Sequence, residues 1–187
     1  MTSILPRTRR WNVDEYYCMS ELSVLHPEER TELIEGEIII MAAKKPPHAA
    51  VGKFAADYLR NLLAGIADIR TQDPVHLSNS SEPEPDIAVV RINTRNYIDH
   101  HPISSEIFLV IEVADATLQY DLKRKAEIYA MASIIEYWVI DVNEQQIHVF
   151  QEPKEKTYQQ KRILAVVDKV ALLAFPEINI SIRNFFP

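Results

Sequence analysis

The chain of 187 residues is long enough for one substantial hydrophobic core, and its 47% hydrophobic and 25% charged residues are ordinary for a globular domain. No apolar run reaches the ~18 residues of a membrane-spanning helix, and the first seven residues lack the apolar stretch of a secretory signal. We therefore expect a cytoplasmic protein. The single cysteine, Cys18, excludes an internal disulfide and a cysteine-rich zinc cage.

Glycine is scarce, and Gly36, Gly52 and Gly65 cannot assemble the glycine-rich loops that hold dinucleotides or nucleoside triphosphates. We therefore expect no nucleotide cofactor. The formal net charge of −7 argues against strong nonspecific binding of nucleic acid. Basic residues nevertheless gather locally, so the overall sign of the charge need not describe a binding face. These gatherings are Arg7, Arg9 and Arg10; Lys44 and Lys45; and Lys123, Arg124 and Lys125.

The first half of the chain predicts a helix, a β-hairpin and a second helix. Asn12 is suited to cap a helix that runs through Leu22. Residues 31–34 and 37–41 flank Glu35-Gly36, a pair typical of a tight hairpin turn. After Pro46-Pro47, apolar residues recur at helical spacing as far as Gly65. A short strand at 75–77 and a loop over 78–85 follow.

The second half predicts the centre of a sheet. Residues 86–90 and 107–113 are apolar on both faces and rich in β-branched residues, which is typical of interior strands. A helix over 119–132 leads to strands at 137–140 and 146–150, so a parallel crossover is expected. We interpret residues 163–175 as an extension of the sheet and 178–182 as a last strand. The prediction is one α/β domain over residues 1–187, with a mixed central sheet flanked by helices.

Two acidic residues suggest a site. If strands 86–90 and 107–113 are antiparallel neighbours, Asp86 at the start of the first lies opposite Glu112 at the end of the second. Opposed carboxylates repel each other unless a cation neutralises them, and Mg²⁺ is held by one or two carboxylates with water and phosphate. Each residue also has a structural interpretation, Asp86 as a strand-start residue and Glu112 as a strand-end residue near solvent.

Lys125 is the third candidate, from the helix that follows Glu112. Leu122, Lys125 and Tyr129 are spaced by three and four residues and so share one helix face, which points Lys125 toward the sheet. Lys123 falls on another part of the helix, toward solvent. The alternative interpretation of Lys125 is a lysine whose stem lies at the core's edge and whose ammonium reaches water.

Several segments together resemble the pattern of the Uma-two family of bacterial domains, which is abundant in cyanobacteria and grouped with restriction endonucleases in the PD-(D/E)XK nuclease superfamily. The resemblance spans roughly residues 11–150. The segments that carry it are Glu32 to Glu37, Pro47-His48, Pro85-Asp86-Ile87, Ile111-Glu112-Val113, Asp121 with Lys125, Tyr129-Ala130 and Glu136-Tyr137-Trp138.

The resemblance implies that Asp86 and Glu112 bind metal. In the superfamily, a lysine two residues after the second acid helps to activate water, but Ala114 occupies that position here. The family resemblance brings a lysine from the following helix instead, and it falls on Lys125. The resemblance also implies a homodimer, which the apolar strand at 147–150 would favour if its edge were exposed. It suggests as auxiliary groups Glu32, Glu35 or Glu37, and His48.

These observations predict a metal-dependent endonuclease that hydrolyses phosphodiester bonds in nucleic acid, with DNA as the expected substrate. Mg²⁺ or Mn²⁺ would be held by Asp86, Glu112 and the backbone carbonyl of Val113, with Lys125 orienting water or stabilising charge. The main alternative is a nuclease-like scaffold without turnover that binds proteins or regulates them. A glycosidase with paired carboxylates is a weaker alternative, because no aromatic series suited to a sugar cleft surrounds the pair.

Overall fold

The fold is built on a mixed six-stranded sheet, as seen in a computed structural model that describes residues 7–26 and 28–187. The expectation about a secretory signal therefore falls mainly outside the described residues. Only β5 and β6 run parallel, and all other neighbours in the sheet are antiparallel. In spatial order the strands are β3 (Asp68–Arg70), β4 (Ile87–Val90), β5 (Ile107–Ala114), β6 (Glu136–Asp141), β7 (Gln146–Lys154) and β8 (Thr157–Ala165).

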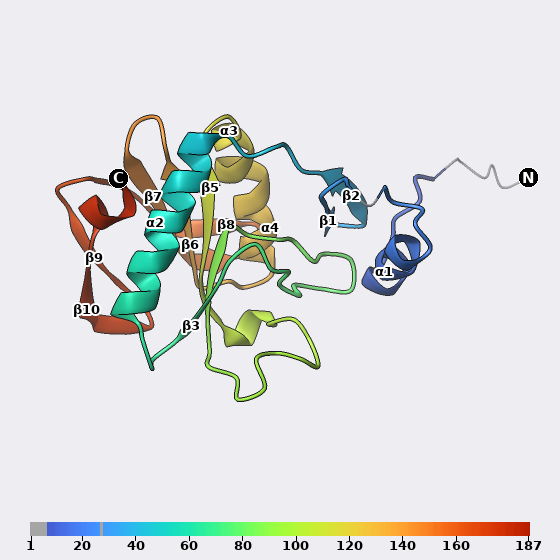
Figure 1. Cartoon of the computed structure of the whole chain (residues 1–187), viewed down its shortest axis with the longest axis horizontal. Coiled ribbons are helices and arrows are strands. Elements are labelled where there is room, and N and C mark those ends of the chain that lie inside the picture. Colours follow the sequence, from blue (N-terminus) through green and yellow to red (C-terminus); the bar gives the residue numbers. More distant parts are fainter. Residues whose placement is uncertain (1–6, 27) are drawn as a thin grey trace, which may run out of the picture.

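The N-terminal elements form as predicted and lie to one side of the main sheet, on the right of Figure 1. Asn12 caps α1 (Val13–Glu21) in a reciprocal capping box with Glu15. Strands β1 (Thr31–Ile34) and β2 (Glu37–Ile40) form the hairpin. Gly36 in its turn has a φ of +76°, and a Cβ there would lie 2.8 Å from the Cβ of Arg10. Glycine is therefore required on both conformational and steric grounds.

Helix α2 (Pro46–Leu62) covers one face of the sheet (Figure 1). Its residues Val51, Ala55 and Leu59 are buried against alternate residues of β4 and β5. The C-terminal elements cover the rest of that face. They are β9 (Lys169–Leu172) and β10 (Phe175–Ser181), which form a separate two-stranded sheet, and η3 (Ile182–Phe185). The expected strand extension in the tail thus exists, but only β8 joins the main sheet.

A helical segment between β5 and β6 covers the opposite face. It comprises α3 (Leu118–Tyr120), η2 (Asp121–Lys125) and α4 (Ala126–Met131). The sequence predicted one uninterrupted α-helix over 119–132, but η2 is a π-helical turn. Such wide turns are common at functional sites and leave no mark in the hydrophobic period. Tyr129 of α4 packs against Tyr137 of β6, with ring centroids 4.9 Å apart.

Two other expectations need correction, and one strand was not predicted. Strand β7 pairs with β6 on one side and β8 on the other, so residues 147–150 have no exposed edge to favour a dimer. Residues 75–77 make only a single bridge, between His76 and Ile103, just before the short helix η1 (Ser104–Glu106). Strand β3 was not predicted, because three residues are too few for a period. None of the helices in the described ranges is long and apolar enough to cross a membrane.

Candidate active site

Two adjacent strands bring Asp86 and Glu112 together, as the sequence predicted. Ile87 pairs with Ile111 in the antiparallel ladder of β4 and β5, so the residue before β4 lies beside Glu112. The backbone N–H of Val113 donates to Oδ2 of Asp86 at 2.9 Å. This hydrogen bond fixes the Asp86 carboxylate at the end of β5, where Glu112 also lies.

Asp86 also has two cationic partners that come from outside the sheet. The Lys44 ammonium donates to Oδ1 at 2.8 Å, and Nε2 of His48 lies 3.1 Å from Oδ2. Lys44 belongs to the segment between β2 and α2, and His48 to the first turn of α2. Burial alone would raise the pKa of Asp86, but His48 and Lys44 outweigh it and hold that pKa at about 2. The Asp86 carboxylate is therefore ionised at neutral pH.

Glu112 lies in a different electrostatic environment. Lys125 donates to its Oε1 at 3.1 Å, and the hydroxyl of Tyr129 donates to the same oxygen at 2.7 Å. Burial raises the pKa of Glu112 to about 8, against the attraction of Lys125, and the nearby carboxylates of Asp86 and Asp121 raise it further. Among the described residues, no hydrogen bond reaches the second oxygen, Oε2. A cation at Oε2 would favour the ionised form of Glu112.

Lys125 is buried, with 4% of its surface exposed, and it faces the sheet as its helical spacing predicted. Its ammonium donates to Oε2 of Glu32 at 2.8 Å as well as to Glu112. Burial alone would lower the pKa of Lys125, but these two carboxylates raise it well above its ordinary value. Lys125 is therefore a fixed positive charge between two acids and cannot serve as a base. Lys123, two residues earlier, is exposed.

The structure separates the auxiliary candidates. Glu32 and His48 line the same cavity as Asp86 and Glu112. Glu35 instead pairs with Arg124, and Glu37 pairs with Arg10 at 2.6 Å, and neither lines that cavity. Glu35 thus reaches the helical segment that carries Lys125 but lies outside the cavity, and Glu37 pairs with the N-terminal segment at Arg10.

Two further residues join the site. One is Lys44, which the sequence placed only in a local basic pair. The other is Asp121, which entered only through the family pattern. It is buried at the start of η2, and Thr117 donates to it at 2.6 Å. Burial raises the pKa of Asp121 to about 6, although the hydrogen bond from Thr117 and the charge of Lys125 act against this. The contact between Lys44 and Asp86 could not be predicted from the spacing of residues in the sequence.

These groups line a cavity of about 380 Å³ between the β2–α2 segment and the α3–η2 helix. The acids that line this cavity outnumber the lysines, so its charge is net negative when all the acids are ionised. The acids are Glu32, Asp86, Glu112, Asp115 and Asp121, and the lysines are Lys44, Lys45 and Lys125. A divalent cation would neutralise that excess, so the donor set fits Mg²⁺ or Mn²⁺ held by two carboxylates with water and phosphate. Within residues 7–26 and 28–187, no group of three or more Asp, Glu, His or Cys side chains is arranged to hold a metal ion, so two carboxylates would share the coordination with water, phosphate and the backbone.

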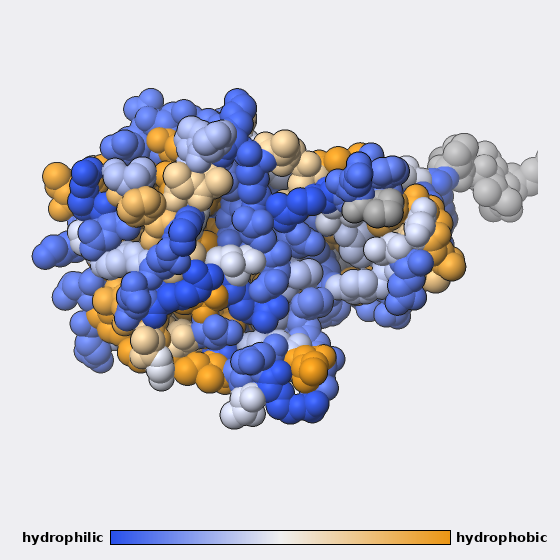
Figure 2. All heavy atoms as spheres, in the orientation of Figure 1, coloured by the Kyte–Doolittle hydropathy of each residue, from blue (hydrophilic) through white to orange (hydrophobic). Residues whose placement is uncertain are grey.

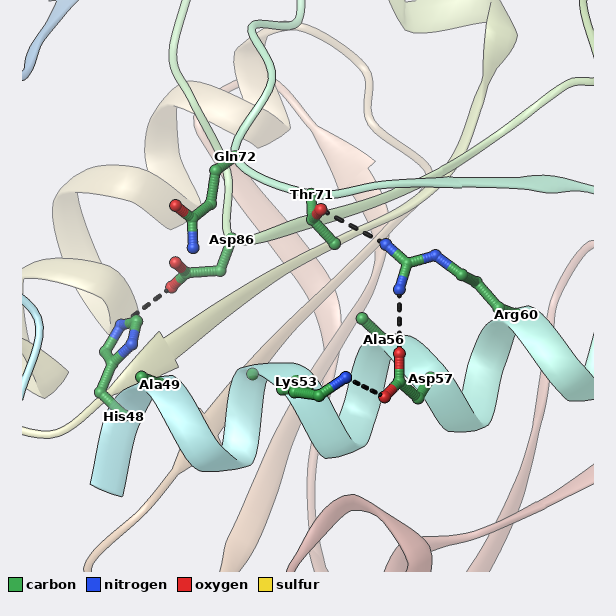
Figure 3. Close-up of a pocket in the computed structure, with 10 residues that line it drawn as sticks. His48, Ala49, Lys53, Ala56, Asp57, Arg60, Thr71, Gln72 and Asp86 are labelled. Atoms are coloured by element: carbon green, nitrogen blue, oxygen red, sulfur yellow. Dashed lines mark hydrogen bonds and ion pairs between the residues drawn. The ribbon is translucent and has the colours of Figure 1, made fainter. Parts of the chain in front are cut away.

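A second, more polar cavity of about 210 Å³ adjoins the first at Asp86 and His48. Figure 3 shows the Gln72 side chain beside Asp86, and Lys53 and Arg60 both directed at Asp57 of α2. Nδ1 of His48 is buried without a hydrogen-bond partner among the described residues. Asp86 therefore lines both cavities.

Comparison with known proteins gives the family. A model of the Uma2 (Uma-two) family, described as "Putative restriction endonuclease", matches residues 13–183. The fold is similar to the crystal structure of a "putative nuclease belonging to DUF820" from Anabaena variabilis, with a TM-score of 0.69. That likeness covers 94% of this chain and 97% of the other at 19% identity, so it shows the fold alone. No curated protein matches the chain. Since the family model spans most of its length, the chain belongs to the Uma2 family.

Proposed function

We propose that this protein is a metal-dependent endonuclease that hydrolyses phosphodiester bonds in nucleic acid, at the cavity between the β2–α2 segment and the α3–η2 helix. One observation carries the proposal. Asp86 and Glu112, from neighbouring antiparallel strands, meet in a cavity that has more carboxylates than lysines. The family description and the nuclease-like fold point to the same reaction class.

In this proposal Asp86, Glu112 and the backbone carbonyl of Val113 hold Mg²⁺ or Mn²⁺. When bound, the ion supplies positive charge that polarises the scissile phosphate and lowers the pKa of an attacking water. Lys125 keeps Glu112 oriented, because it donates to Oε1 and leaves Oε2 available to a metal ion. Its fixed charge also stabilises negative charge that develops on the phosphate.

Lys44 has a separate part in the proposal. In the metal-free protein its ammonium is bound to Oδ1 of Asp86, an oxygen that a metal would need. When a metal ion binds that oxygen, the Lys44 ammonium is released. Lys44 still lines the cavity, on a segment without regular secondary structure, and can contact a substrate phosphate.

The experiment is incubation of the purified protein with plasmid DNA, single-stranded DNA and RNA in Mg²⁺ or Mn²⁺, with a chelator control. Asp86→Ala is the test variant, and Asp57→Ala, in the adjoining cavity, is its matched control. We expect metal-dependent cleavage by the wild type and by Asp57→Ala, and none by Asp86→Ala. Equal cleavage by Asp86→Ala, or no cleavage of any substrate, contradicts the proposal.

A scaffold without turnover is the second candidate, and one observation favours it. Asp86 already has three protein partners, Lys44, His48 and the Val113 amide, so its charge is balanced without a metal. A scaffold predicts no Mn²⁺-dependent thermal shift. The homodimer now rests on the family resemblance alone, and a monomeric mass by light scattering at micromolar concentration contradicts it.

A further inference from the structure

The 380 Å³ cavity has two chemically different parts. One part carries the acids and lysines of the site. The other is an apolar wall to which the end of β2 and the segment after it, residues 39–43, contribute together with Val113 and Ala116. Metal chemistry on a phosphate requires only the charged part, so the apolar wall has no role in the reaction proposed above.

Tyr120 adds an aromatic ring to this cavity. It is the last residue of α3, and 37% of its surface is exposed. Tyr120 lines the cavity together with Glu32, Asp121 and Lys125, so it belongs to the charged part of the cavity as well. An aromatic face next to a phosphate-binding site is the arrangement on which nucleic-acid bases stack.

The cavity volume lies near the lower end of the ~300–1,000 Å³ range of sites that enclose one small molecule. A base within a duplex is covered by its neighbours on both faces and by its partner at its edge. Such a base cannot reach the apolar wall while the scissile phosphate lies at Asp86. A base that is unpaired can do so, because the backbone lets it turn away from the strand.

We propose that the apolar wall and Tyr120 bind an unpaired base next to the scissile phosphate, so that the substrate is single-stranded nucleic acid or a duplex with an unpaired nucleotide. This inference rests on the proposed endonuclease function. Charge agrees with it, because the cavity is lined by three lysines and five acids, so few phosphate contacts are available there to hold a duplex. Stacking supplies affinity with little positive charge and tolerates any base.

The test is the dissociation constant of one DNA oligonucleotide in three forms: single strand, blunt duplex, and duplex with one bulged nucleotide. Binding is measured by fluorescence anisotropy in chelator and again in Ca²⁺. We expect the single strand and the bulged duplex to bind at least about tenfold more tightly than the blunt duplex. Tyr120→Ala should weaken single-strand binding by about tenfold, the scale of one stacked base, and Tyr120→Phe should not.

Two further variants keep the test decisive. Tyr17→Ala changes an equally exposed tyrosine outside the cavity and should leave binding unchanged. Ala42→Glu places a carboxylate on the exposed segment of the wall and should weaken single-strand binding even if Tyr120→Ala folds poorly. Equal binding of single strand and blunt duplex, with no effect of Tyr120→Ala or Ala42→Glu, overturns the inference. If the blunt duplex is then also cut, the proposed function survives; if no nucleic acid is bound or cut, both fail.

Discussion

The ammonium of Lys125 donates a hydrogen bond to Oε1 of Glu112 at 3.1 Å, and the two residues are buried together between β5 and η2. Despite that partner, burial and neighbouring carboxylates raise the pKa of Glu112 to about 8 from its ordinary value of 4.5. The metal-free folded protein therefore holds a proton on Glu112 that the unfolded chain releases at much lower pH.

This proton makes stability depend on pH. Between about 4.5 and about 8 the folded state binds more protons than the unfolded state, so the free energy of unfolding falls as pH rises. One group contributes a slope of at most about 1.4 kcal/mol per pH unit. Urea unfolding in chelator at pH 5, 6, 7 and 8 measures it. Glu112→Gln should flatten the slope, whereas Asp121→Asn should affect it only below about pH 6. An equal slope in Glu112→Gln contradicts this account.

Two lysines on one helical segment provide a matched pair. Lys125→Ala leaves the buried Glu32 carboxylate without its cation and removes a hydrogen-bond donor to Glu112, so we expect the free energy of unfolding to fall by about 3–5 kcal/mol. Below the unfolding temperature of the variant, kcat should fall about 100-fold or more, the scale of a lost electrostatic stabiliser. Lys123→Ala, at an exposed position, should change stability by no more than about 0.5 kcal/mol. Similar losses in both variants, removed by added salt, would leave Lys125 no special role.

Lys44 and Lys45 provide a second pair, next to each other before α2. Lys44 competes with a metal for Oδ1 of Asp86, so Lys44→Ala should raise Mn²⁺ affinity by about tenfold, the equivalent of one weak charge interaction. The same variant should lower kcat/KM, because no ammonium meets the substrate phosphate. Lys45 lines the same cavity, but it is the exposed N-cap residue of α2 and makes no ion pair with Asp86, so Lys45→Ala should not raise the Mn²⁺ affinity. Weaker Mn²⁺ binding in Lys44→Ala contradicts the proposed exchange.

Much of the fold could be predicted because its signals are local. Asn12 with Glu15 marks a helix start, Glu35-Gly36 marks a hairpin, and β-branched runs mark β4 and β5. Long-range features could not be predicted. Strand β3 is too short to show a hydrophobic period. Strand β7 is an interior strand only because β8 pairs with it, and the sequence does not specify that pairing. The π turn η2 leaves the hydrophobic pattern unchanged.

The candidate site divides in the same way. The register of two apolar strands suffices to place Asp86 beside Glu112, and helical spacing suffices to turn Lys125 inward. The contact of Lys44 with Asp86 depends on the path of a segment without regular structure, so no periodic pattern predicts it. Glu32 could not be distinguished from Glu35 and Glu37, because only tertiary packing brings β1 to Lys125.

The most direct measurement is the affinity of the purified protein for Mn²⁺, determined by titration calorimetry at pH 8. The account predicts saturable binding by the wild type, loss of that binding in Asp86→Asn and in Glu112→Gln, and retention in Asp57→Asn. Asp57 is a suitable control because it is an exposed carboxylate of the adjoining cavity, held by Lys53 and Arg60. Absence of Mn²⁺ binding by the wild type, or undiminished binding by Asp86→Asn, would contradict a metal site at Asp86 and Glu112.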